Sequence, residues 1–176
     1  MTSGSVRVGE IDWTAWRPRD RATLVFVVQG GEVLLIRKLR GLGAGKVNAP
    51  GGRLAPDETP LQCAVREVRE EVCVTPLAPE LRGELSFQFV DGYSIHAYVF
   101  LATGCEGEPG PTEEAIPFWV PPQRIPYGEM WADDRLWVPR LLDGECFRGR
   151  FCFDGDRMLS HELEVCEARA CDAASP

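Results

Sequence analysis

The sequence predicts a single α+β domain in which a mixed β-sheet is sandwiched between α-helices. Two β-branched and aliphatic runs, 23–28 and 33–38, are separated by Gly30-Gly31, which indicates a β-hairpin. A helical repeat of apolar residues begins after Thr59. The length of 176 residues suits one domain with a sizeable core, and the chain contains no internal repeat or linker.

Three segments are predicted along the chain. Residues 1–19 form a poorly patterned extension, residues 20–168 form the domain, and residues 169–176 form a frayed tail. Trp13 and Trp16 have large apolar rings that could pin the extension to the domain.

The central helix has a clear beginning. Thr59 is a favourable N-cap, Pro60 suits the first helical position, and Gln62 completes a capping box. Apolar residues then recur at helical spacing and predict one buried stripe that consists of Leu61, Ala64, Val65, Val68 and Val72.

The remaining elements follow from shorter patterns. The glycine-rich loop 41–45 precedes a turn at Gly51-Gly52, and it lacks the Gly-Lys-Ser/Thr ending of a P-loop, which excludes that motif. Later in the chain we expect strands over 83–90, 94–102 and 116–120, a Gly/Pro/Glu loop over 104–111, a helix over 133–142 bent by Pro139, and a closing hairpin of 147–153 and 158–165 with its turn near Asp154-Gly155.

Composition excludes several classes of protein. The chain is 44% hydrophobic and 26% charged, as is usual for soluble globular proteins, and it has no membrane-spanning stretch or signal pattern. Its net charge of −8 disfavours a polymeric nucleic-acid partner but allows a small polyphosphate that arrives with its own Mg²⁺. Seven scattered cysteines without a C-x-x-C pair argue against a disulfide framework or a zinc site and fit reduced thiols in a cytoplasmic protein.

The helix after Thr59 also carries a set of carboxylates. Glu67, Glu70 and Glu71 have i, i+3, i+4 spacing, which places them on a face different from the apolar stripe. Carboxylate-only clusters suit hard divalent cations, and Mg²⁺ in particular binds substrate phosphates while keeping several waters. The simpler alternative is a solvated helix face in which Arg66 and Arg69 form intrahelical ion pairs.

The spacing of these residues resembles the signature of the Nudix hydrolases. From Gly52 through Glu58 to the run 66–74, every defined position of G-x5-E-x7-R-E-U-x-E-E-x-G-U matches except one, where Cys73 replaces the last glycine. That glycine usually ends the helix in a left-handed conformation, which costs a residue with a Cβ on the order of 1 kcal/mol. The substitution affects helix termination rather than metal ligands.

The resemblance extends over 20–168 to the branch that hydrolyses oxidised purine nucleoside triphosphates, the 8-oxo-dGTP-type sanitising enzymes. It rests on 41–48, 87–89, 113–119 and 125–134, of which the Met-Trp-x-Asp-Asp string is the most specific. Around the base and sugar it implies Thr23, Lys38, Asn48, Phe87, Trp131, Asp133 and Asp134. As metal ligands it implies Gly51 through its carbonyl, with Glu67, Glu70, Glu71 and Glu114.

The implied reaction is a Mg²⁺-dependent pyrophosphohydrolysis, with Mn²⁺ as an alternative cation. A metal-held water attacks the triphosphate in line and releases a nucleoside monophosphate and pyrophosphate. Glu71 is our first choice for the essential carboxylate, with either Glu71 or Glu114 near the water. Arg66 orients the cluster through Glu58. We expect a monomer or a small homo-oligomer.

Several residues have simpler explanations that stay open at this point. Asp133 suits the N-cap of the following helix, Asn48 suits a turn, and Trp131 and Phe87 suit a core. Two adjacent aspartates in an apolar pocket cannot both ionise cheaply, so one of them could keep its proton and read a base edge as a donor. Alternative functions are hydrolysis of another nucleoside-diphosphate-linked substrate and a non-catalytic nucleotide-binding module.

Overall fold

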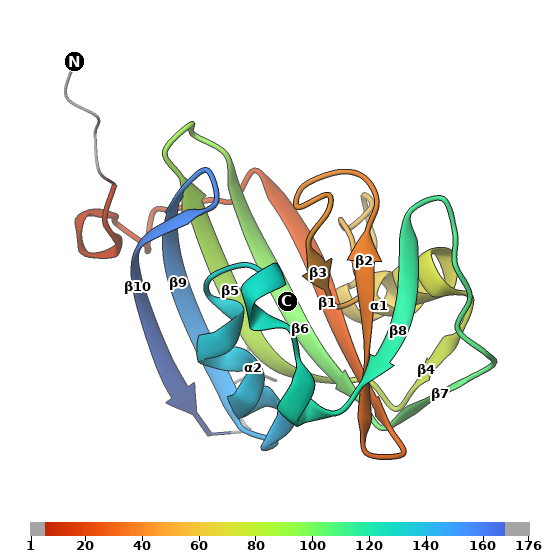
Figure 1. Cartoon of the computed structure of the whole chain (residues 1–176). Coiled ribbons are helices and arrows are strands. Elements are labelled where there is room, and N and C mark those ends of the chain that lie inside the picture. The colour runs from red at the N-terminus through yellow and green to blue at the C-terminus, as the bar shows by residue number, and fades with distance from the viewer. Residues whose placement is uncertain (1–5, 168–176) are drawn as a thin grey trace.

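The computed structural model describes residues 6–167 and confirms an α+β fold built on one large mixed sheet (Figure 1). The sheet has eight strands in the order β10-β9-β5-β6-β1-β2-β3, with β8 paired to β2, and a separate two-stranded sheet joins β4 and β7. The strands are β1 Asp20–Gln29, β2 Glu32–Lys38, β3 Val47–Asn48, β4 Thr75–Leu77, β5 Glu80–Phe89, β6 Ser94–Ala102, β7 Gly104–Glu106, β8 Ala115–Val120, β9 Cys146–Asp154 and β10 Arg157–Cys166. The helices are α1 Pro60–Val72 and α2 Asp134–Leu142, with 3₁₀ turns η1 Val8–Glu10, η2 Pro122–Arg124 and η3 Tyr127–Glu129.

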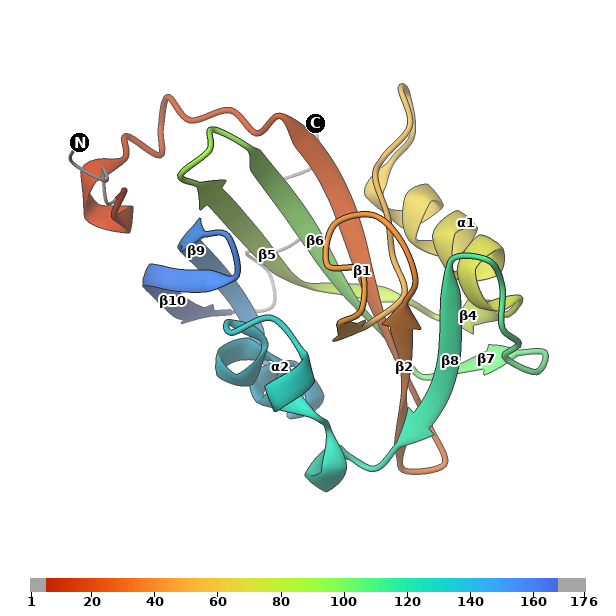
Figure 2. The same cartoon turned by 45° about the horizontal axis from the view of Figure 1, so that its top comes forward.

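The two helices cover opposite faces of the sheet (Figure 2). The alternation of β1 explains this arrangement, because Val25 and Val27 pack with α1 residues such as Val68, whereas Phe26 packs against Trp137 of α2. One sheet therefore separates two hydrophobic cores.

Most predicted elements are confirmed, including the opening hairpin, in which Gly30 and Gly31 both have positive φ. The expected loop over 104–111 is wrong in part, because β7 pairs antiparallel with β4 there. The two-residue strand β3 was also missed.

No helix among the described residues has the length and apolar character needed to cross a membrane.

The start of α1 matches its prediction. The Thr59 hydroxyl accepts a hydrogen bond from the Gln62 backbone N–H, and the Gln62 side chain accepts one from the Thr59 N–H. At the other end Cys73 adopts a left-handed conformation with φ of 66°. Cys73 therefore takes the backbone conformation that glycine favours.

The predicted apolar stripe of α1 needs correction. Leu61 is exposed and Cys63 is buried in its place. Glu71, on the face that carries the carboxylates, is also buried and only 3% exposed. The backbone at Gly51 and the Thr112 side chain cover that flank of the helix, because the Gly51 N–H donates to Glu71 and the Thr112 hydroxyl donates to the Glu71 carbonyl.

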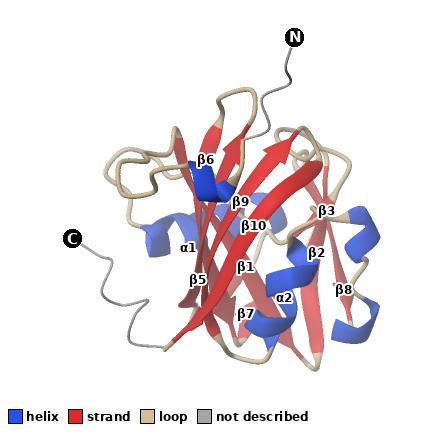
Figure 3. Ribbon diagram, turned by 90° about the vertical axis from the view of Figure 1, so that its left-hand side faces the viewer, coloured by secondary structure: helices blue, strands red, loops and turns tan. Residues whose placement is uncertain are grey.

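The N-terminal segment is attached to the edge of the sheet, as its tryptophans predicted. The Trp16 indole N–H donates to Gln88 on β5 at 2.8 Å, and the Val8 N–H donates to the Ser160 hydroxyl on β10 at 2.9 Å. The Arg150 guanidinium lies 5.4 Å from the centre of the Trp13 ring. Figure 3 shows β10 as the outer strand on this side of the sheet. The predicted tail, 169–176, lies outside the described residues.

Candidate active site

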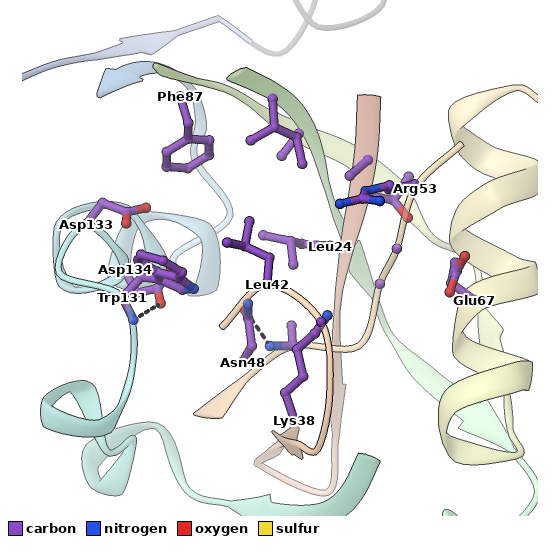
Figure 4. Close-up of a pocket in the computed structure, with 18 of the residues that line it drawn as sticks. Leu24, Lys38, Leu42, Asn48, Arg53, Glu67, Phe87, Trp131, Asp133 and Asp134 are labelled. Atoms are coloured by element: carbon purple, nitrogen blue, oxygen red, sulfur yellow. Dashed lines mark hydrogen bonds between the residues drawn. The ribbon is translucent and has the colours of Figure 1, made fainter. Parts of the chain in front are cut away.

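A pocket of about 500 Å³ opens between the two helices and across β1, β3, β5 and β6. All seven residues expected around the base and sugar line it, namely Thr23, Lys38, Asn48, Phe87, Trp131, Asp133 and Asp134. Gly51, Glu67, Glu71 and Glu114 line it as well, whereas Glu70 and Arg66 do not. Figure 4 shows Asp133, Trp131 and Phe87 on one side of the pocket and Glu67 of α1 on the other.

The pocket exists because β1 and β2 separate after their hairpin. They pair only over Val27–Gln29 with Glu32–Leu34, and the segment 50–54 then takes the place of β2 beside β1. The Thr23 N–H donates to the Gly52 carbonyl, and the Val25 N–H donates to the Pro50 carbonyl, each at 2.8 Å. This backbone exchange brings Gly51 and Gly52 against α1.

Close approach rather than backbone conformation favours glycine at both positions, most strictly at Gly51, whose neighbour is backbone, and less strictly at Gly52, whose neighbour is the movable end of a side chain. A Cβ on Gly51 would lie 1.9 Å from the Thr23 carbonyl oxygen, and a Cβ on Gly52 would lie 2.3 Å from the Glu67 carboxyl carbon. The two glycines therefore set how near the loop comes to the carboxylates.

Glu71 is the most deeply placed of these carboxylates. Its Oε2 accepts a hydrogen bond from the Gly51 N–H at 3.0 Å. Burial raises the pKa of Glu71 to about 7, against the opposing effects of that hydrogen bond and of the Lys38 ammonium, and the negative charges of Glu67 and Glu114 raise it further.

Arg66 organises the outer carboxylates. Its Nε and Nη2 form a bidentate pair with Glu58 at 2.6 and 2.9 Å, and its Nη1 donates to Glu67 at 2.7 Å and to Glu70 at 2.9 Å. Hydrogen bonding to this guanidinium lowers the pKa of Glu58 to about 2. Arg66 therefore contacts the cluster directly rather than through Glu58 as expected, and Glu58 binds the remaining nitrogens of the guanidinium. Glu70, whose side chain is 57% exposed, points to Arg66 rather than into the pocket.

Glu114 lies at the rim, where its Oε1 is 3.1 Å from Arg40 Nη2. Within residues 6–167, no three His, Cys, Asp or Glu side chains already converge as a ready-made metal site. The donor set still fits a hard divalent cation, because Glu67, Glu71 and Glu114 supply carboxylate oxygens whose charges repel one another. A cation there would replace the contacts of Glu67 with Arg66 and of Glu114 with Arg40.

The opposite end of the pocket is built around two buried aspartates. Asp133 is 1% exposed and Asp134 is 3% exposed. Asp133 Oδ2 accepts from the Trp137 indole N–H at 2.8 Å, Asp134 Oδ2 accepts from the Trp131 N–H at 3.1 Å, and Asp133 Oδ1 is buried without a protein partner. Burial raises the pKa of Asp133 to about 6, and burial together with the charge of Asp133 raises the pKa of Asp134.

Asp133 occupies the N-cap position of α2, as the helix-cap explanation expected, but its side chain does not cap the helix. Its backbone is already helical, with φ of −77° and ψ of −26°, and its side chain makes no capping hydrogen bond. The carboxylate is held by Trp137 instead and faces the pocket, whose lining includes it (Figure 4).

Aromatic rings form the walls near these aspartates. Phe87 stacks on Phe151 at a centroid distance of 5.3 Å and an interplanar angle of 20°. Trp131 stands edge-on to Phe153, and Lys46 Nζ lies 5.0 Å from the Trp131 ring and 3.0 Å from Asp156. Lys46 therefore ties the glycine-rich loop to Trp131 and to the β9–β10 turn.

Two of the predicted residues point elsewhere than expected. The Thr23 hydroxyl contacts the Cys63 thiol on α1 at 3.4 Å, so that residue reaches the pocket mainly through its backbone. Asn48 Oδ1 accepts from the Ala49 N–H at 2.8 Å, as in a turn, although its side chain also lines the pocket (Figure 4).

Some lining residues were missed from the sequence. They are apolar or aromatic side chains on the sheet, such as Leu24, Phe89, Ile95, Ala97 and Phe153, together with Tyr93 and Arg53. The alternation along β1, β5 and β6 offers a signal, because Leu24, Phe87, Phe89, Ile95 and Ala97 all lie on the face toward α2. Without the strand order, however, that signal does not separate pocket from core.

Comparisons with known proteins identify the family of this chain. The NUDIX domain model matches residues 18–141, and the chain therefore belongs to the NUDIX family.

Two relatives and one solved structure show which members of the family this chain is similar to. The chain is 42% identical over 147 residues to the oxidized purine nucleoside triphosphate hydrolase of Danio rerio, covering 82% of this chain and 94% of that protein. The Mus musculus protein of the same name is 38% identical, covering 80% and 92%. Among solved structures, the MutT protein of Bacillus halodurans superposes with a TM-score of 0.75 at 30% identity, covering 82% of this chain and 97% of that one.

Proposed function

We propose that this Nudix hydrolase cleaves oxidised purine nucleoside triphosphates to the nucleoside monophosphate and pyrophosphate, and thereby sanitises the nucleotide pool. The observation that carries the proposal is a single pocket with two buried aspartates at one end and the family carboxylates at the other. A purine base fits the first end and a triphosphate fits the second. The Danio rerio and Mus musculus relatives, named for this substrate class, support the same assignment.

The base end supplies both surface and polar partners. Phe87 and Trp131 offer flat faces for a purine, and burial there favours one protonated aspartate. In that state Asp133 and Asp134 present a donor and an acceptor together. An oxidised purine differs from its parent in the hydrogen-bonding atoms at its edge, which such a pair can distinguish.

The phosphate end of the pocket places charged side chains beside the triphosphate. A divalent cation, Mg²⁺ or Mn²⁺, held by Glu67, Glu70, Glu71, Glu114 and the Gly51 carbonyl, would neutralise the phosphates and activate a water. Arg66 keeps Glu67 and Glu70 in place, and Lys38, whose charge acts on Glu71, adds positive charge beside the triphosphate path. Glu71, buried under the Gly51 N–H, is the carboxylate on which activity depends most, and either it or Glu114 takes the proton of the attacking water.

The test is a kinetic comparison of dGTP, 8-oxo-dGTP and 2-hydroxy-dATP, with Mg²⁺ and with a chelator, in which the products are identified by chromatography. We expect pyrophosphate and monophosphate as products, no turnover with chelator, and a kcat/KM at least about tenfold higher for an oxidised nucleotide, a difference of about 1.4 kcal/mol in barrier. Release of orthophosphate, or equal kcat/KM for all three nucleotides, would contradict the proposal. We also propose that the protein is cytoplasmic and is a monomer or a small homo-oligomer.

A further inference from the structure

Two cysteines face each other at the open end of the β9–β10 hairpin. Cys166 of β10 is the direct register partner of Cys146 of β9, and the neighbouring pair Val165 and Phe147 keeps the same register. Directly opposite residues in an antiparallel pair have Cα atoms about 4.5–5.5 Å apart and side chains on one face. Disulfides span Cα separations of about 4.4–6.8 Å, so the spacing of a register pair such as this one lies within the range that a disulfide bridges.

The other cysteines lack such a partner in the part of the chain that the structure describes. Cys152 is opposite Ser160, Cys63 contacts Thr23, and Cys73 ends α1. Cys105 lies opposite Pro76 in the small sheet. All six described cysteines are reduced in this structure.

We propose that Cys146 and Cys166 are an oxidative modification site, at which a peroxide forms a reversible cross-strand disulfide. Cys166 is half-exposed and meets the oxidant, whereas Cys146 is buried and acts as the resolving thiol. The Cys166 sulfur attacks hydrogen peroxide, the O–O bond breaks, and the thiol proton leaves with the departing hydroxide as water, which gives a Cys166 sulfenic acid. The Cys146 sulfur then attacks the Cys166 sulfur, and the sulfenic hydroxyl leaves with the Cys146 thiol proton as a second water.

The bridge would fasten the outer strand to the wall of the substrate pocket. β9 contributes Phe153 to the pocket lining and Phe151 to the support of Phe87. The cysteines themselves lie outside the pocket, at the opposite end of the hairpin from the turn that holds Asp156 against Lys46. Oxidation should therefore stabilise the fold and leave turnover of a saturating nucleotide within about twofold.

Trypsin offers a direct test on the full-length protein, because arginines separate the relevant cysteines. Cleavage after arginine places Cys146 in 141–148, Cys152 in 151–157, Cys166 in 158–169 and Cys171 in 170–176. After treatment with hydrogen peroxide, removal of the oxidant and blocking of free thiols, mass spectrometry without reductant should show 141–148 joined to 158–169. Reduction should release both peptides, and the oxidised protein should melt on the order of 5 °C higher than the reduced one.

Matched variants control the assignment. Cys166→Ser, at a half-exposed position, should abolish the joined peptide and the rise in melting temperature. Cys171→Ser and Cys73→Ser should leave both unchanged. If 158–169 joins 170–176 instead, or if 141–148 and 158–169 remain separate while the thiols are oxidised singly, the proposal is overturned.

Discussion

The two ends of the pocket hold their carboxylates with different partners. At the α1 end, Arg66 contacts Glu58, Glu67 and Glu70, and the Gly51 N–H contacts the buried Glu71. At the α2 end, Asp133 and Asp134 are almost fully buried, each accepts a hydrogen bond from one tryptophan N–H, and no arginine or lysine within residues 6–167 forms an ion pair with them.

This difference suits the two ends of the pocket to different steps, one to the chemical reaction and the other to the selection of the base. At the α1 end, Arg66 holds Glu67 and Glu70 through ion pairs that a cation can replace, which suits the chemical step. At the α2 end, burial raises the pKa of both aspartates and Asp133 Oδ1 is left without a partner among the described residues, which suits hydrogen bonding to a base. Changes at the first end should therefore act on kcat, and changes at the second should act on the ratio between substrates.

The largest effect is expected for Glu71→Gln. It removes the ionisable group of the most buried carboxylate on α1 and keeps its shape, so kcat should fall by at least about 1,000-fold, roughly 4 kcal/mol of barrier, while the fold remains intact. Glu113→Gln is the matched control, because Glu113 is 93% exposed beside the same site and should retain full activity. A Glu71→Gln enzyme within about tenfold of the parent would remove this carboxylate from the mechanism.

The next effect concerns base selection. Asp133→Asn and Asp134→Asn should change the ratio of kcat/KM between 8-oxo-dGTP and dGTP about ten- to a hundredfold, because an unmade buried hydrogen bond costs roughly 1–3 kcal/mol. Asp143→Asn, at the exposed C-terminal end of the same helix, should leave the ratio unchanged. An unaltered ratio in both pocket variants would contradict the assignment of base selection to these two aspartates.

A smaller effect should appear in the dependence of stability on pH. The folded pKa of Asp133 is raised to about 6 from its usual value, so the folded state binds this proton more tightly than the unfolded state does. Its stabilising contribution is present below about pH 4 and is lost as the pH rises through about 6.

Denaturant unfolding at a series of pH values measures this loss. The free energy of unfolding of the parent should fall relative to that of Asp133→Asn, by on the order of 2 kcal/mol between pH 4 and pH 7. In parallel, KM for 8-oxo-dGTP should rise with pH in the parent as the second aspartate ionises. Parallel stability curves for the two proteins would show that the carboxyl is not held protonated.

The smallest effect is expected outside both ends, at the C-terminus of α1. Cys73→Gly should raise the free energy of unfolding by about 1 kcal/mol, or the melting temperature by roughly 2–4 °C, because glycine adopts positive φ without strain. Cys73→Ala, which keeps a Cβ, serves as the control and should stay within about 0.5 kcal/mol of the parent. Activity should be unchanged in both variants.

Local signals in the sequence predicted the parts of the fold that depend on neighbouring residues. The Thr59 to Gln62 capping box, the Gly30-Gly31 turn and the Asp154-Gly155 turn all formed as expected. The predicted apolar stripe of α1 failed at Leu61, which is exposed. The burial of Glu71 could not be predicted either, because segments far from the helix in sequence cover that position.

Features that depend on long-range pairing could not be predicted. The strands β4 and β7 have three residues each and are defined only by each other, and nothing in 20–38 indicates that β1 and β2 part after three register pairs. The resemblance to the oxidised-purine branch placed Thr23 and Asn48 around the base and sugar. In the structure the Thr23 hydroxyl contacts the Cys63 thiol and the Asn48 side chain accepts from the next backbone N–H, and the sequence indicated neither contact.

The parallel pairings of the sheet have a consequence for how the molecule folds. β1 joins β6 with Asp20 opposite Ile95, and β5 joins β9 with Gly83 opposite Phe147, so the centre of the sheet is closed by contacts between distant parts of the chain. Loop closure of this kind is slow, whereas the hairpins and α1 need only local contacts. Because β1, β5, β6 and β9 all contribute walls to the pocket, nucleotide binding should appear late in refolding, after most of the helical signal has recovered.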